Sequence, residues 1–64
     1  MIAVIHINMD NAAFQDYDNP AHELARILEK LSRSVSDNLY LSDGYSIPLF
    51  DINGNDVGYL GISR

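Results

Sequence analysis

The fold of this chain is decided by one stretch, which runs from Asn19 to Val35 and reads NPAHELARILEKLSRSV. Its apolar residues recur at the i, i+3, i+4 and i+7 positions that place side chains on one face of a helix. These residues are Ala21, Leu24, Ile27, Leu28, Leu31 and Val35. The opposite face is charged, as expected of a face in solvent, and carries Glu23, Arg26, Glu29, Lys30 and Arg33. The spacing therefore predicts one amphipathic helix that buries a single face.

Both ends of this helix are marked by the residues found there. Asn19 is a good N-cap, because its side chain accepts a backbone N–H, and Pro20 suits the first helical position, where a missing N–H costs nothing. Glu29 and Arg33 stand four residues apart in the order that favours an ion pair. Serine and aspartate compete for backbone hydrogen bonds, so the helix is expected to end within residues 34–37.

The segment from Ile2 to Met9 is rich in β-branched residues and predicts the first strand. Successive side chains of a strand point to opposite faces. One face is apolar throughout and is assigned to the core beneath the helix: Ala3, Ile5, Ile7 and Met9. The other face turns polar along the strand and is expected to be partly solvated: Ile2, Val4, His6 and Asn8.

A β-hairpin is predicted over Ile47–Ile62, because Asn53-Gly54 between two apolar, β-rich runs is a strong hairpin signal. Two registers compete for this hairpin. A two-residue turn at Asn53-Gly54 places Asp51 opposite Asp56, and like charges directly opposed are unfavourable.

The preferred register has a three-residue hairpin loop. It makes Asp51 the first residue of a type I turn and Gly54 the left-handed bulge residue. It pairs Asp51 with Asn55 and Leu49 with Val57.

The predicted fold is α+β, in one domain spanning residues 1–64. Pro48 cannot donate to a strand ladder, so the strand over residues 47–52 is expected at an edge of the sheet. The strand over residues 57–62 is then central. The result is a three-stranded antiparallel sheet of order 1-3-2 with one helix on one face, in the sequence β-α-(β)-β-β. The bracketed element, residues 39–41, is either a short strand or part of a loop.

A single helix leaves the second face of the sheet without a partner. In the connections, Phe14 is expected to plug the core and Ser42-Asp43-Gly44 to form a turn. Either these connections fold over the second face, or it stays uncovered as a binding or homodimer interface. In each register this face carries some of Val4, Tyr45, Phe50, Tyr59 and Leu60.

The charge and composition exclude several classes of function. The 64 residues include nine acidic and four basic ones, for a net charge of −5, which excludes binding of nucleic acid through phosphate neutralisation. No cysteine is present, so no disulfide or thiolate metal site is expected. The N-terminal apolar run stops at Ile7, which predicts neither a signal peptide nor a membrane span. A cytoplasmic location is therefore expected.

Catalytic and cofactor chemistry is not indicated. Residues 51–56, DINGND, resemble the start of an EF-hand loop, but Asp56 and Ile62 replace its glycine and glutamate. His6 and His22 have no spacing of a ligand pair, and no nucleophile elbow or phosphate loop occurs. We therefore expect no enzyme, metal or cofactor.

Two sets of residues are candidates for contact with a protein partner. Acidic side chains complement a basic partner surface, and the candidates are Asp10, Asp16, Asp18, Asp37, Asp43 and Asp56. Tyrosines are frequent binding hot spots, and the candidates are Tyr40, Tyr45 and Tyr59.

Three stretches resemble a known group of proteins. They are DNAAF at 10–14, ELARIL at 23–28 and DINGNDVG at 51–58. In this order they are similar to very small proteins encoded in phages, prophages and other bacterial mobile elements.

The resemblance implies a role in conflict between phage and host. Small acidic proteins of that context include anti-CRISPR inhibitors, which bind a CRISPR effector that presents a basic channel for nucleic acid. By this analogy the chain is expected to inhibit such a complex by steric or electrostatic blockade. The alternative is a structural or accessory phage protein that dimerises.

Overall fold

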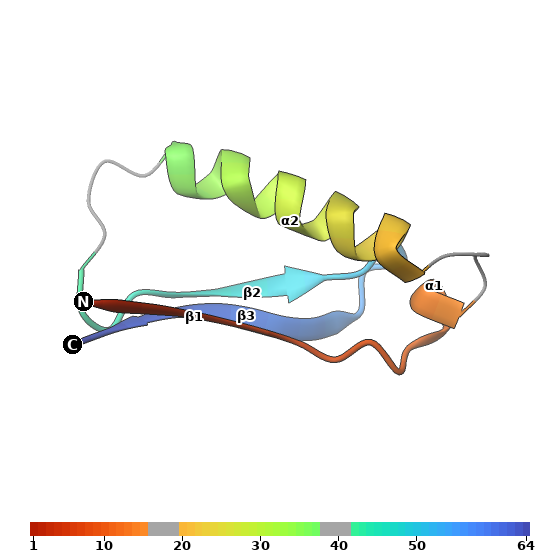
Figure 1. The fold of residues 1–64 in the computed structure, drawn as a ribbon, viewed down its shortest axis with the longest axis horizontal. Coiled ribbons are helices and arrows are strands. Elements are labelled where there is room, and N and C mark those ends of the chain that lie inside the picture. The colour runs from red at the N-terminus through yellow and green to blue at the C-terminus, as the bar shows by residue number, and fades with distance from the viewer. Residues whose placement is uncertain (16–19, 38–41) are drawn as a thin grey trace.

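The computed structural model describes residues 1–15, 20–37 and 42–64. Its elements follow the order β1 (Ile2–Ile7), α1 (Ala12–Gln15), α2 (Pro20–Ser36), β2 (Ser46–Phe50) and β3 (Asp56–Ser63). The strands form one antiparallel sheet of order β1-β3-β2, and α2 lies along one side of it (Figure 1). The predicted α+β class, strand order and single main helix are confirmed.

Helix α2 begins and ends where the sequence predicts. Pro20 is its first residue and Ser36 its last, while the proposed N-cap Asn19 lies outside the described residues. The predicted pair on its surface is present, with Nη2 of Arg33 3.0 Å from Oε1 of Glu29.

The core lies between α2 and the sheet. The buried apolar residues are Ala13, Phe14, Ile27, Leu31, Leu49, Val57, Leu60 and Ile62. Phe14 is 1% exposed, which confirms it as a core plug, and it belongs to the short helix α1, which the sequence did not predict. Asn11 caps α1, since its side-chain oxygen accepts the N–H of Ala13 at 2.8 Å and its carbonyl oxygen accepts that of Phe14 at 3.0 Å.

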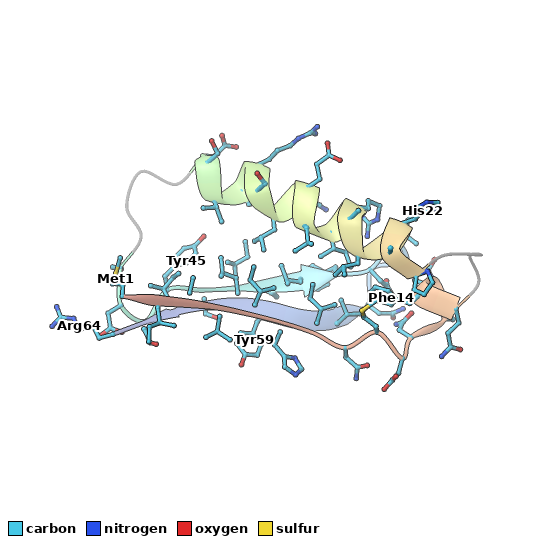
Figure 2. All side chains as sticks on the ribbon, in the orientation of Figure 1. Met1, Phe14, His22, Tyr45, Tyr59 and Arg64 are labelled. Atoms are coloured by element: carbon cyan, nitrogen blue, oxygen red, sulfur yellow. The ribbon has the colours of Figure 1, made fainter. Side chains whose placement is uncertain are left out.

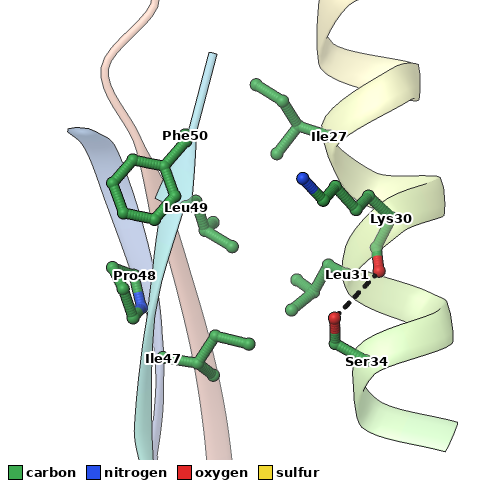
Figure 3. A pocket seen from close by; sticks show the side chains of 8 residues that line it. All are labelled: Ile27, Lys30, Leu31, Ser34, Ile47, Pro48, Leu49 and Phe50. Carbon is green, nitrogen blue, oxygen red and sulfur yellow. Dashed lines mark hydrogen bonds between the residues drawn. The ribbon is translucent and has the colours of Figure 1, made fainter. Parts of the chain in front are cut away.

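The assignment of β1 to the core is wrong. Ala3, Ile5 and Met9 are exposed, and of the predicted core face only Ile7 packs partly against the core. The helix packs over β2 and β3 instead. Figure 3 shows side chains of α2 facing β2, where Ile47 and Leu49 point toward the helix. Leu28, expected in the helix's buried face, is 40% exposed, because its side of α2 faces the uncovered β1.

The preferred register of the hairpin is confirmed at its tip. The N–H of Asp51 donates to the carbonyl oxygen of Asn55 at 2.9 Å, and that of Gly54 donates to the carbonyl oxygen of Asp51 at 3.0 Å. Gly54 has a φ of +85°, in the left-handed region that glycine adopts without strain.

The predicted pairing further along the hairpin is wrong by one residue. Leu49 pairs with Gly58 rather than Val57, and Phe50 pairs with Asp56. Val57 is therefore the extra residue of a β-bulge, and its side chain is buried in the core. The bulge lets an additional apolar side chain of β3 enter the core.

The turn before β2 is confirmed. The N–H of Tyr45 donates to the carbonyl oxygen of Ser42 at 3.0 Å, and Gly44 has a φ of +88°. Tyr45 is half-buried and packs against the core, and Figure 2 shows it on the α2 side of the sheet. The alternatives for residues 39–41 concern a segment outside the described residues.

The glycines of β3 were predicted to mark close approach of another group, which is confirmed at Gly58 but not at Gly61. A Cβ added at Gly58 overlaps the carbonyl oxygen of His6 on β1. A Cβ added at Gly61 lies 3.5 Å from the ring of Tyr59, which is an ordinary contact distance.

Substitution of Gly58 is therefore expected to be costly. Gly58→Ala should lower the free energy of unfolding by about 2 kcal/mol, because the added methyl forces two backbones apart. Gly61→Ala is the matched control and should stay within about 0.5 kcal/mol of the wild type. Chemical denaturation measures both. Equal stability of the two variants would contradict this packing of β3 against β1.

Candidate protein-binding surface

A buried carboxylate fixes the start of α2 to the tip of the hairpin. Glu23 is 4% exposed, and its Oε1 accepts a hydrogen bond from Nε of Arg26 at 2.6 Å. Its Oε2 accepts the backbone N–H of Ile52 at 2.8 Å. Nη2 of Arg26 donates in turn to the carbonyl oxygen of Phe50 at 3.3 Å. These contacts set the position of the helix above the hairpin.

This environment favours the ionised form of Glu23. The hydrogen bond from Arg26 lowers the pKa of the Glu23 carboxyl; burial opposes this, and the N–H of Ile52 lowers the pKa further. The net result is a pKa below the ordinary value of 4.5.

The expectation that Glu23 lies on the solvated face is wrong. The buried residues of α2 are Glu23, Ile27 and Leu31, which are spaced four apart. Residues four apart share a helix face. Glu23 lies one turn before the apolar pair Ile27 and Leu31. This four-residue spacing is the signal in the sequence that could have predicted the burial of Glu23.

A second buried carboxylate, Asp51, organises the turn itself. Its Oδ1 accepts the N–H groups of Asn53 and Asn55, each at 2.8 Å, and its Oδ2 accepts Nδ2 of Asn55 at 3.1 Å. Burial raises the pKa of the Asp51 carboxyl, but these bonds, together with one from the side chain of Asn11, hold it below the ordinary 3.8. Because Asn11 also caps α1, Asp51 links the hairpin to the chain that follows β1.

The side of the sheet opposite α2 forms what we name the outer face. The register and the alternation of side chains place six apolar or aromatic side chains on it: Ile2, Val4, His6, Pro48, Phe50 and Tyr59. All six are exposed, and none is covered within the described ranges. Figure 3 shows Pro48 and Phe50 pointing away from α2, and Figure 2 shows the same of Tyr59. Val4, Phe50 and Tyr59 were among the residues predicted for this face.

Tyr59 occupies the centre of the outer face. It lies between His6 on β1 and Pro48 on β2, which are its partners in the two strand ladders. Its ring stacks on that of His6, with centroids 5.7 Å apart and an interplanar angle of 12°. Two carbons of the ring also lie near Gly61, at 3.5 and 3.6 Å from the position that a Cβ would take there. The aromatic ring is thus held in place while 45% of the residue stays exposed.

The predicted acidic candidates do not form one patch. Asp10 and Asp56 line a shallow polar depression near the hairpin tip. Asp37 follows the end of α2, and Asp43 lies in the turn before β2, with an oxygen 4.0 Å from Nε of Arg64. All four are exposed.

The other predicted contact residues, three tyrosines and two aspartates, do not lie together either. Tyr59 is on the outer face, whereas Tyr45 packs on the core side. Asp16, Asp18 and Tyr40 lie outside the described residues.

An apolar groove runs between α2 and β1, with a volume of about 430 Å³. Its apolar lining consists of Ala3, Ile5, Leu28, Leu31, Val35, Leu60 and Ile62. On the β2 side of the helix the space is only about 50 Å³ (Figure 3). The helix thus closes on β2 and leaves the β1 side open.

In the part of the chain that the structure describes, no three His, Asp or Glu side chains are grouped to hold a metal ion. No helix among the described residues has the length and apolarity to cross a membrane.

Comparison with known proteins adds no assignment. No protein-family model matches the chain, and neither a curated protein nor a solved structure matches it.

Loss of the Glu23 charge is expected to loosen the hairpin from the helix. Glu23→Gln should lower the free energy of unfolding by about 1.5 kcal/mol, because a buried charge-assisted bond to Arg26 is lost. Glu29→Gln is the matched control, since its pair with Arg33 is exposed and should contribute less than about 0.5 kcal/mol. Urea denaturation compares the two. A smaller effect at Glu23 than at Glu29 would count against the buried contact.

Stability is also expected to fall in acid. Glu23 and Asp51 both have lower pKa values folded than unfolded, so their contribution is complete above the ordinary values of 4.5 and 3.8. It is lost as the pH falls through the folded values. The melting temperature should therefore drop from about pH 5 downward, and less so in the double variant Glu23→Gln, Asp51→Asn. Thermal scans at several pH values measure this, and parallel curves for both proteins would contradict it.

Proposed function

We propose that this chain is a non-enzymatic protein-binding module that inhibits a nucleic-acid-handling defence complex of a bacterial host, most specifically a CRISPR effector. The outer face carries the proposal. It presents an apolar and aromatic surface on a small sheet, and exposed apolar patches of this kind mark protein interaction sites.

The centre of the outer face has the composition of a binding hot spot. Tyrosine is enriched at such positions because its rigid ring buries a large area while its hydroxyl stays hydrated. Tyr59 is held by His6 on one side, so little side-chain freedom remains to be lost on binding. Val4 and Phe50, each 46% exposed, extend the apolar surface on either side.

The distribution of charge supports a basic partner. At the hairpin end, Asp56 pairs with Phe50 and forms an acidic rim beside the apolar centre, with Asp10 close by. Complementary charge at a rim steers association and selects the partner. Channels that bind nucleic acid are basic, so an acidic chain of net charge −5 is steered toward them.

These features favour blockade by contact over mimicry of nucleic acid. A phosphate mimic requires a continuous track of acidic groups, whereas the four described candidate aspartates lie at three separate places. Apolar contact through Tyr59 persists in salt that screens the rim charges. The resemblance to mobile-element proteins supports the host defence system as the setting.

The proposal is tested first in cells. The chain is expressed in bacteria whose CRISPR effector targets an infecting phage, and plaque formation is expected to be restored. Tyr59→Ala should abolish this effect, because loss of a central hot spot of about 2 kcal/mol weakens binding about thirtyfold. Binding of the purified effector to the wild type and the variant measures that factor directly.

Ile52→Ala is the matched control. Ile52 is 53% exposed, similar to Tyr59, but lies on the hairpin turn rather than on the outer face. It should inhibit like the wild type. If Tyr59→Ala also inhibits fully while lysine at Asp10 and Asp56 abolishes inhibition, charge rather than the outer face makes the contact. If plaque formation and effector binding never change, the inhibitory function is overturned.

A further inference from the structure

We propose that a second copy of this chain pairs with the free edge of β1, in antiparallel orientation, to form a six-stranded sheet. The order of strands across the dimer is then β2-β3-β1-β1-β3-β2. This inference concerns an edge and a groove, not the outer face, and stands independently of the proposed function.

The backbone of β1 has hydrogen-bonding groups on its open side. In an antiparallel ladder, successive residues bond alternately to one side and the other. The N–H of Asn8 donates to the carbonyl oxygen of Val57 on β3 at 2.7 Å. Because the bonding direction alternates, the backbone groups of Val4 and His6 also point toward β3. It leaves the backbone groups of the odd-numbered residues pointing away from the sheet: Ala3, Ile5 and Ile7.

The opposite edge of the sheet is blocked. The N–H of Ile62 on β3 donates to the carbonyl oxygen of Tyr45. Because the bonding direction alternates along the strand, the backbone groups of Ile47 and Leu49 point toward β3, and those of Pro48 point away from the sheet. A proline at an outward position has no N–H to offer a further strand. The six residues of β1 contain neither proline nor lysine, and no register shift interrupts their pairing with β3.

The side chains beside the open edge are apolar and contiguous with the groove. Ile5 is 48% exposed on β1 and Leu28 is 40% exposed on α2, and both line the groove. A two-fold axis perpendicular to the sheet, midway between the two β1 strands and level with Ile5, places Ile5 opposite Ile5 of the second copy and Ala3 opposite its Ile7. Both α2 helices then lie on the same face, and the two grooves face each other across the axis.

The charge pattern permits this contact between two acidic chains. The strand IAVIHI contains no carboxylate, lysine or arginine, so no like charges are opposed along it. The net charge of −5 on each copy acts only from outside the contact. Salt should therefore strengthen the association by screening that repulsion.

The exposed area also fits a second copy. Among the described residues, four large exposed apolar side chains lie on the groove side of β1, next to its ends or in the groove: Met1, Ile5, Met9 and Leu28. A stable dimer buries about 600 to 800 Å² on each partner, so pairing must cover groove and edge together.

The test combines molar mass with amide hydrogen exchange. Light scattering should give twice the 7.2 kDa of one chain, falling toward 7.2 kDa on dilution. The amides of Ala3, Ile5 and Ile7 should exchange slowly only where the dimer is populated. Those of Val4 and His6 bond within one copy and should exchange slowly at every concentration.

Ile5→Lys places two like charges at the axis and should lower the association constant at least about tenfold. Slow exchange at Val4 and His6 in this variant shows that β1 remains paired with β3. Phe50→Lys is the matched control, 46% exposed on the opposite edge strand, and should dimerise like the wild type, as should Tyr59→Ala.

A chain that stays at 7.2 kDa at about 1 mM overturns the proposal, since a stable interface associates well below that concentration. A dimer that survives Ile5→Lys, or one whose formation leaves the amides of Ala3, Ile5 and Ile7 in fast exchange, overturns it as well. Protection of these amides only on adding a different protein assigns the edge to that partner instead.

Discussion

The arrangement of this small chain depends on the hydrogen bond between the buried carboxylate of Glu23 and the backbone N–H of Ile52. A domain of 64 residues buries only about 60% of the surface that its unfolded chain exposes, so its stability margin is thin and single buried contacts matter. One ionised group on α2 therefore positions the hairpin, and Arg26 completes the contact by bonding both Glu23 and the chain at Phe50. Asp51 performs the corresponding task between the hairpin turn and the segment after β1.

The position of the helix determines which surfaces remain available. Because Glu23 ties α2 to the hairpin, the helix covers β2 and β3 and leaves β1 without a buried residue. One consequence is the open groove beside β1. The other is an edge of β1 that pairs with no strand among the described residues. The outer face has a different origin, since a single helix covers only one side of a sheet. The uncovered β1 side and the outer face therefore have two different causes.

Periodicity predicted much of this structure from the sequence. The limits of α2, the order of the strands, the turn at Gly54 and the edge position of the strand with Pro48 all follow from local chemistry and are observed. The burial of Glu23 and the exposure of Ile5 were missed for one common reason. Periodicity identifies the apolar side of a helix or strand, but it does not say where the helix lies across the width of the sheet.

The candidate surface was predicted only in part, also for a physical reason. The central position of Tyr59 follows from the strand order, whereas the separation of the aspartates depends on how loops end in space, which charge counting does not reveal. Pro48 has one more consequence. In the proposed dimer the outermost strand on each side is β2, where Pro48 has no N–H to offer a further strand. The pyrrolidine ring therefore ends that sheet at six strands, and pairing through β1 does not continue into a fibre.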